Sequence, residues 1–149
     1  MTEGTLVYII NSERVLLAMK KRGFGQGKWN APGGKIKNGE SPMEAAIRET
    51  QEEVGVTPTL RRQLGTITYH DPKDGDWNVH VFRATALSGE PVESEEMEPQ
   101  WWALSAIPYD RMWAGDEQWL PYVLRDHPFV AEIWMDGNGG VKKLNVKNA

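Results

Sequence analysis

Apolar stretches separated by short polar turns predict that much of the chain is β-structure. Such strands are rich in Val, Ile, Leu and aromatic residues and are bounded by Gly, Pro, Asn, Asp or Ser. The expected strands are residues 5–10, 14–20, 63–70, 77–87, 100–104, 129–136 and 141–147. The first two flank the turn "NSE" and the last two flank "GNGG", so each pair is expected to form a hairpin.

A helix is predicted to start at Pro42. Ser41 is a good N-cap, proline is favoured at the first helical position, and Glu44 completes a Ser-x-x-Glu capping box. Gly55 stands where a left-handed C-cap residue is expected. One stripe of this helix should face the core, and its members recur at helical spacing: Met43, Ile47, Thr50 and Val54.

A second helix is predicted over residues 116–127, with Asp116 as its N-cap. The segments 21–29 and 30–40 are too rich in Gly and Pro to be regular structure and are expected to be loops. Few helices among many strands indicate an α/β fold, in which helices pack on the faces of a mixed sheet.

The composition suits one ordinary globular domain. With 149 residues, the chain fits a single domain spanning 1–149. Charged residues make up 26% and apolar residues 40%, which argues against disorder. The N-terminal segment lacks the basic flank of a secretory signal, and no apolar stretch approaches the roughly 20 residues that span a bilayer. We therefore expect a cytoplasmic protein that does not bind membranes.

Charge and cysteine content exclude further classes. The chain has no cysteine, so it has no disulfide and no thiolate zinc site. Its formal net charge of −4 provides no overall attraction to nucleic acid. We therefore expect no nucleic-acid partner.

Seven tryptophans are many for this length. Aromatic side chains at this density either fill the core or stack on a flat ligand. Three of them are assigned to the core: Trp101, Trp102 and Trp134. The histidines show no metal-ligand spacing and are expected to be structural: His70, His80 and His127.

Three carboxylates lie close together on the first predicted helix, at Glu49, Glu52 and Glu53. They point roughly 130° away from the core stripe and so form a separate flank. A run of like charge is commonly a solvated face, although like charges at these spacings repel by roughly a few tenths of a kcal/mol. A divalent cation reverses the sign of that interaction, and Mg²⁺ prefers carboxylate oxygens, with phosphates completing its shell. The flank is therefore either a solvated face or a magnesium site.

The neighbouring residues favour the magnesium site. Gly33 and Gly34 allow the main chain to come close to a ligand or metal. Glu40 lies beside the helix start, where the helix dipole favours an anion. Arg48 can bridge to these acids and hold their rotamers.

Together these residues resemble the Nudix box. Gly34, Glu40 and the segment "RETQEEVGV" at residues 48–56 match its glycine and polar positions over residues 34–56. The one departure is Thr50, where an aliphatic residue is usual, and it should affect packing more than chemistry. The resemblance implies the Nudix fold, an α/β/α sandwich with a mixed sheet. It also implies a pyrophosphohydrolase that cleaves a nucleoside diphosphate linked to another group, X.

The same resemblance implies the metal and its ligands. Mg²⁺, with Mn²⁺ as a substitute, would bind the Gly33 carbonyl and the carboxylates Glu49, Glu52 and Glu53, while water attacks phosphorus. We expect Glu49 and Glu53 to hold metal. Glu52 or Glu96 would act as the base or as a further ligand, and one sequence does not separate these roles.

Beyond the box, the chain is similar to animal enzymes that convert oxidised purine nucleoside triphosphates, such as 8-oxo-dGTP and 2-oxo-dATP, to monophosphates. The segments "RVLLAMKKRGFGQGKWNAPGGK", "VHVFRA", "PVESEEMEP" and "MWAGDEQWLP" carry this similarity. It implies that a nucleoside triphosphate is the partner of this chain, which is expected to be a monomer. Among the implied substrate contacts, Thr5 and Phe24 are wall residues, Asn30 bonds the base and Trp113 stacks on it. The others are Lys20, Gly33, Gly34, Lys35 and Asp116, and Glu96 approaches the metals.

Two departures from the animal pattern concern the base pocket. Adjacent aspartates follow the stacking tryptophan in those enzymes, whereas here Gly115 takes the first place and only Asp116 remains. An apolar wall residue is replaced by Asp71, with Tyr69 and Trp77 as neighbours. We expect purine recognition to persist and the preference among oxidised, methylated and normal purines to shift.

Two other readings remain open. The chain could hydrolyse another nucleoside diphosphate derivative, such as a dinucleoside polyphosphate or a nucleotide sugar. It could also be a non-catalytic binding module, although such modules typically lose box glutamates.

A local positive field for a triphosphate is expected from four cations: Lys20, Lys21, Arg22 and Lys28.

Overall fold

A curved mixed β-sheet runs through the molecule, and the computed structural model describes the whole chain, residues 1–149. The strands are β1 (Thr2–Asn11), β2 (Arg14–Lys20), β3 (Trp29–Asn30), β4 (Thr57–His70), β5 (Trp77–Ser88), β6 (Met97–Ala103), β7 (Phe129–Met135) and β8 (Val141–Asn148). The helices are α1 (Pro42–Val54) and α2 (Asp116–Leu124), with short 3₁₀ turns at Leu104–Ala106 and Tyr109–Arg111.

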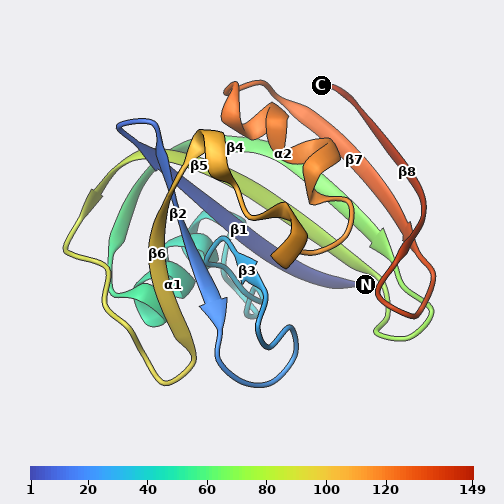
Figure 1. Cartoon of the computed structure of the whole chain (residues 1–149), viewed down its shortest axis with the longest axis horizontal. Coiled ribbons are helices and arrows are strands. Elements are labelled where there is room, and N and C mark those ends of the chain that lie inside the picture. The colour runs from blue at the N-terminus through green and yellow to red at the C-terminus, as the bar shows by residue number, and fades with distance from the viewer.

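The strand order is β3-β2-β1-β5-β4-β7-β8, with β6 paired to β2 (Figure 1). The pairs β1–β5 and β4–β7 are parallel, and the other pairs are antiparallel. The predicted mixed sheet and both predicted hairpins are therefore confirmed. Each of the two predicted loops, 21–29 and 30–40, is one residue shorter than expected, because Trp29 and Asn30 pair with β2 as β3.

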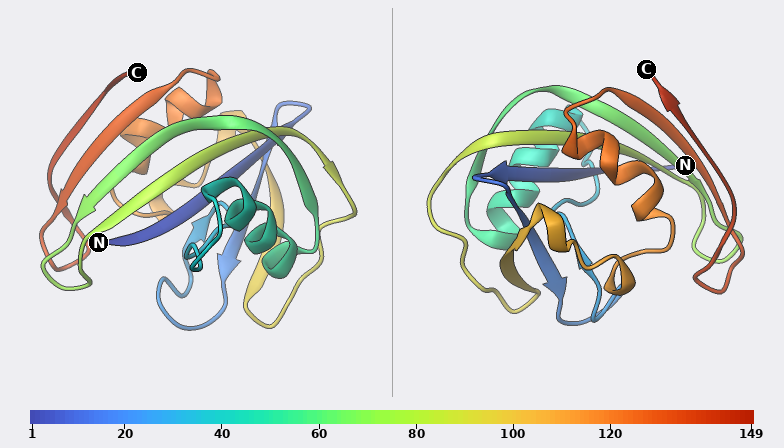
Figure 2. Two further views of the ribbon diagram at one scale, coloured as in Figure 1. Left: turned by 180° about the vertical axis from the view of Figure 1, so that it is seen from behind. Right: turned by 45° about the horizontal axis from the view of Figure 1, so that its top comes forward.

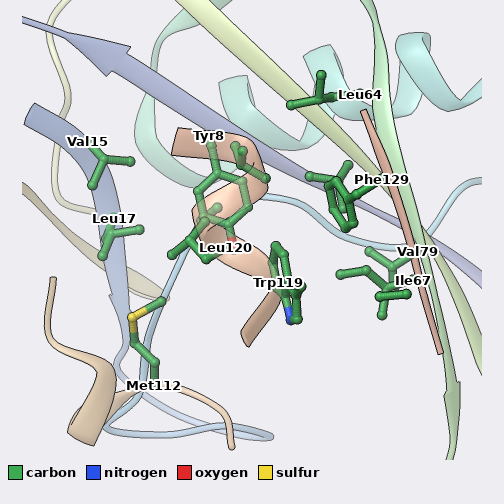
Figure 3. Close-up of a cluster of buried hydrophobic side chains, with 14 of the residues drawn as sticks. Tyr8, Val15, Leu17, Leu64, Ile67, Val79, Met112, Trp119, Leu120 and Phe129 are labelled. Carbon is green, nitrogen blue, oxygen red and sulfur yellow. The ribbon is translucent and has the colours of Figure 1, made fainter. Parts of the chain in front are cut away.

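The two helices lie on opposite faces of the sheet, as the two views in Figure 2 show. Strand β1 alternates between the faces, so that Tyr8 and Ile10 pack on one side and Val7 and Ile9 on the other. The first side is the larger core and includes Trp119 from α2, whose ring packs beside Tyr8 and Phe129 (Figure 3). The result is the expected α/β/α arrangement.

Helix α1 has the predicted ends. Ser41 and Glu44 form the reciprocal capping box, and Gly55 closes the helix in the left-handed conformation with φ 74°. The core stripe is confirmed at Thr50 and Val54, which are fully buried, whereas Met43 and Ile47 are only half-buried. Ala45 and Ala46 are the other two fully buried residues of the helix. The Thr50 hydroxyl donates to the Ala46 carbonyl at 2.7 Å, which satisfies the hydroxyl within the core.

Helix α2 corrects two expectations. Its N-cap is Gly115, and Asp116 is the first helical residue, with its side chain buried instead of capping the helix. The helix ends at Leu124, before the predicted end at residue 127, because Arg83 binds the terminal carbonyls of Val123 and Leu124 at 2.6 and 2.9 Å.

The tryptophan assignment was right only in part. Trp101 and Trp102 are half-buried and pack against the two cores. Trp134 belongs to neither core, because its ring lies on the outer face of β7. There it stacks on His70 and makes a cation–π contact with Lys143. Neither helix has the length and apolar character needed to cross a bilayer.

Candidate active site

Arg48 is the centre of an ion-pair network on the flank of α1. Its guanidinium donates to Glu40 at 2.6 and 3.0 Å, to Glu49 at 2.9 Å and to Glu52 at 3.1 Å. A further bond reaches the Lys35 carbonyl at 3.1 Å. These contacts fix the rotamers of the acids and connect the preceding loop to the helix.

Glu40 is the best-satisfied acid of this network. The hydrogen bonds from Arg48, followed by that from the Lys37 amide, lower the pKa of Glu40 to about 2. The carboxylates raise the pKa of Arg48 in turn. Glu40 and Arg48 thus remain a charged pair at all moderate pH values.

Glu53 has a different environment. Its Oε1 accepts a 2.8 Å hydrogen bond from the Gly33 amide. Burial raises the pKa of Glu53 to about 7; the Gly33 hydrogen bond opposes this shift, and the charges of Glu49 and Glu96 add to it. A partly buried carboxylate beside two others is therefore held close to its point of protonation at neutral pH.

The glycines before α1 allow the backbone to approach these acids. A Cβ at Gly33 would lie 1.9 Å from the Thr5 carbonyl oxygen, and one at Gly34 would lie 2.5 Å from the Glu49 carboxyl carbon. The Thr5 amide binds the Gly34 carbonyl at 2.9 Å, and this pairing ties the loop to β1. No other residue type fits at Gly33, where the close contact is with backbone, whereas a side chain at Gly34 would displace the Glu49 carboxylate.

A second charged cluster joins the loop after β2 to the acidic loop before β6. Glu96 accepts from Lys20 at 3.3 Å and from Arg22 at 3.1 Å, and these two cations lower its pKa. Lys21 pairs with Glu93. The expected local positive field is consequently smaller than the sequence suggested, because acids from residues 93–96 neutralise three of its four cations.

A cavity of about 270 Å³ opens beside the carboxylate flank. Its walls come from β1 to β7, α1 and the loops, and most of its surface is apolar, with charged side chains among the lining residues. Of the sequence-predicted substrate residues, the structure places these in the wall: Thr5, Lys20, Phe24, Asn30, Gly33, Gly34 and Trp113. Lys35 and Asp116 are not in the wall.

The aromatic and amide groups are arranged for a flat ligand. The rings of Phe24 and Trp113 lie 5.1 Å apart at 30°, and the Lys28 ammonium lies 5.2 Å from the Trp113 ring. Asn30 Oδ1 accepts from the Ala31 amide at 2.9 Å, so the NH₂ group of Asn30 is left for a ligand.

Asp116 lies behind the wall, 2% exposed, near Tyr8, Tyr69 and Trp119. Burial raises the pKa of Asp116 to about 7. Its Oδ2 has no hydrogen-bond partner. Burial without a hydrogen-bond partner favours the neutral form of this carboxyl group, so Asp116 is mostly protonated below its raised pKa.

A family model described as the NUDIX domain matches residues 2–123, which include the glycine loop, α1 and most of the cavity wall. The chain belongs to the Nudix family. It is 44% identical over 135 residues to the oxidized purine nucleoside triphosphate hydrolase of Danio rerio, which covers 90% of this chain and 86% of that protein. It is 42% identical over 126 residues to the Mus musculus protein of the same name, covering 84% and 81%.

The fold of this Nudix protein is similar to the crystal structure of the mutator MutT protein from Bacillus halodurans. The TM-score is 0.89 at 27% identity, and the match covers 99% of this chain and 98% of that one. The expected Nudix fold is confirmed.

Nudix hydrolases generally use divalent metal ions. The chemistry of the donors in this Nudix domain fits such an ion, because hard carboxylate oxygens of Glu49, Glu52 and Glu53 share one flank and the burial of Glu53 favours a neutralising partner. No three Asp, Glu or His side chains converge on one point, because Arg48 binds Glu49 and Glu52, and Gly33 binds Glu53. A bound cation would compete with Arg48 for these oxygens.

Several wall residues were not found from the sequence. They are distant from one another along the chain, and the sequence assigned none of them a role in binding: Leu6, Asp74, Val79, Met97 and Met135. Only the strand order brings them together, since β7 lies beside β4 and β6 beside β2. Asp71, Tyr69 and Trp77, which the sequence did single out, all lie in the wall.

Proposed function

We propose that this Nudix hydrolase converts modified purine nucleoside triphosphates to the monophosphate and diphosphate, with Mg²⁺ as its cofactor. One observation carries the proposal. Glu53, from the carboxylate flank, lines the same cavity as Asn30 and Trp113. A base that contacts Asn30 and Trp113 in this cavity would therefore place its phosphates toward the acids of α1.

The relatives support a purine nucleotide as the substrate. The Danio rerio and Mus musculus proteins are named as hydrolases of oxidized purine nucleoside triphosphates, and the chain covers most of their length. An indole face stacks on any base, a contact that contributes roughly 1–3 kcal/mol. The free NH₂ group of Asn30 adds a directional donor to a base edge.

Magnesium would be held by Glu49, Glu52 and Glu53 with the Gly33 carbonyl, and by Glu96 in an additional position. When bound, the ion supplies positive charge that lowers the pKa of water and neutralises the phosphates. The protein residues prepare this site. Arg48 orients Glu49 and Glu52, and the Gly33 amide holds one oxygen of Glu53, which leaves the other free.

Glu53 would be a metal ligand, so proton transfer is better suited to Glu52 or Glu96. Glu52 is the most exposed of the three acids, with a side chain 55% accessible, so water reaches it directly.

Steady-state hydrolysis of a matched panel tests the function. The panel contains 8-oxo-dGTP, 2-oxo-dATP, O6-methyl-dGTP, dGTP and dATP, with a dinucleoside polyphosphate and a nucleotide sugar as rivals. We expect Mg²⁺-dependent diphosphate release with a preference for at least one modified purine. Equal, slow turnover of all five triphosphates would exclude a role in removing modified nucleotides.

A further inference from the structure

The polar groups of the cavity are unevenly distributed. Glu53 belongs to the catalytic flank, and Lys20 is already paired with Glu96. The other carboxylates in the wall are Asp71 and Asp74, which lie on the turn between β4 and β5. This turn therefore provides an acidic end to an otherwise aromatic and apolar cavity.

Asp71 is held in a fixed orientation. Its Oδ1 accepts from the amides of Lys73 at 2.9 Å and Asp74 at 3.3 Å, and its own carbonyl accepts from Gly75 at 3.0 Å. Oδ2 makes no hydrogen bond or ion pair within the chain, although the residue is half-buried in the wall. One carboxylate oxygen thus builds the turn, and the other is left to a ligand.

Asp71 and Asn30 approach the cavity from opposite sides. Asn30 is on β3 at one edge of the sheet, and Asp71 follows β4, which is separated from β3 by β2, β1 and β5. Asn30 offers hydrogen-bond donors, whereas Asp71 offers an acceptor that carries negative charge. A ligand that satisfies both has an acceptor at one edge and an N–H donor at the opposite edge.

Asp74 is the other carboxylate of this turn in the wall, and it is exposed, whereas Asp71 is half-buried. The segment that follows the stacking tryptophan provides no further carboxylate to the wall. The segment after Trp113 has no side chain at Gly115, where a Cβ would meet Leu144 at 3.0 Å and Val141 at 3.2 Å. Neither of these residues lines the cavity. Asp116 is buried behind the wall.

We propose that Asp71 is a specificity-determining residue. It selects nucleotides whose base has an N–H donor on the edge remote from Asn30, and it disfavours bases with a carbonyl oxygen or a bare ring nitrogen at that place. The inference rests on the proposed function of the cavity and defines its substrate class further. A carboxylate accepts from an N–H and repels an oxygen or nitrogen lone pair, so it discriminates in both directions. Oxidation of guanine at C8 creates such a donor, because N7 becomes N–H.

Binding of nucleoside monophosphates tests Asp71 independently of hydrolysis. Two pairs differ at the same edge, because oxidation at C8 replaces a bare N7 with N7–H: 8-oxo-dGMP and dGMP, and 8-oxo-dAMP and dAMP. Calorimetry gives the ratio of dissociation constants within each pair. Wild type should favour the donor-bearing member of at least one pair by about tenfold.

The variant D71N keeps the turn and removes the charge, because an amide oxygen accepts the same backbone bonds. Its NH₂ group then faces the ligand, so the wild-type preference should fall to about threefold or less, or reverse. The matched control is D76N, which removes a charge from the same turn at a residue outside the cavity wall. Asp76 Oδ1 accepts from the Asp71 amide at 3.3 Å, and the amide oxygen in D76N can accept the same bond, so the ratio should be unchanged.

Two outcomes overturn the assignment. One is a wild type that prefers no donor-bearing member, and the other is a D71N protein whose ratios all stay within about twofold of wild type. Loss of discrimination in both D71N and D76N would likewise assign the effect to the turn and not to Asp71. Failure of the proposed function would show separately, as absence of triphosphate turnover despite selective monophosphate binding.

Discussion

The Gly33 amide donates a 2.8 Å hydrogen bond to Glu53 Oε1 and so joins the glycine loop to the carboxylate flank of α1. The loop is in turn paired with β1 through Thr5, which lies in the cavity wall. The position of one carboxylate is thereby linked to the wall of the proposed base site. Four consequences can be measured.

Glu53→Gln should lower kcat by at least about 100-fold, because an amide does not hold a metal well. The same change removes a buried charge that Glu49 and Glu96 repel. The thermal midpoint should therefore be unchanged or higher. Diphosphate release and thermal unfolding are the two measurements, and a large loss of stability would mean that Glu53 is structural.

Arg48→Ala should lower the midpoint of urea unfolding, because it leaves Glu40 and Glu49 without the cation that both of them bind. It should also raise the pKa of Glu40 from about 2 toward its ordinary value, which NMR titration can follow. Arg61→Ala is the control, since Arg61 is exposed and has no ion pair. Equal stability of the two variants would contradict the central position given to Arg48.

Gly33→Ala should unfold the protein or lower its stability far more than Gly139→Ala. The added Cβ at position 33 would lie 1.9 Å from a backbone oxygen of β1, which cannot move without breaking the sheet. Gly139 has φ +85° and open space around it, so alanine there incurs only the backbone strain of about 1–2 kcal/mol. Urea unfolding compares the two, and similar midpoints would contradict the close approach at Gly33.

Asp116 should make stability depend on pH. Burial raises its folded pKa to about 7 from an ordinary value of 3.8, so between these values the folded state binds more protons than the unfolded state. Stability relative to Asp116→Asn should then decrease as pH rises from about 4 to 7, and the loss should be complete above the folded pKa. Urea unfolding of both proteins at pH 5 and pH 8 tests this, and parallel pH dependences would contradict it.

Much of the carboxylate flank could be predicted from the sequence, because the residues that determine it are close together along the chain. Ser41, Glu44 and Gly55 determine the ends of α1, and helical periodicity then separates the acids from the core. The position of Asp116 was not predictable in this way. A short polar residue before an apolar segment looks like a cap, and only the packing of α2 against the sheet shows that Gly115 takes that place.

The cavity wall depended on tertiary structure. Met97, Met135 and Asp74 come from separate strands and turns, so no spacing along the chain connects them. The pairing of Lys20 and Arg22 with Glu96 also joins residues far apart in the sequence. It makes the positive field expected around these cations weaker than the sequence alone predicted. Local chemistry could be inferred before the fold was known, whereas the surroundings of that chemistry could not.

The central claim is that the acids of α1 and the aromatic cavity act together on a modified purine nucleoside triphosphate. The most direct measurement is product analysis of 8-oxo-dGTP, 2-oxo-dATP, O6-methyl-dGTP and their unmodified counterparts after incubation with the protein and Mg²⁺. The account predicts monophosphate and diphosphate, with a higher kcat/KM for at least one modified substrate. Release of inorganic phosphate instead, or equal and slow turnover of every triphosphate, would contradict it.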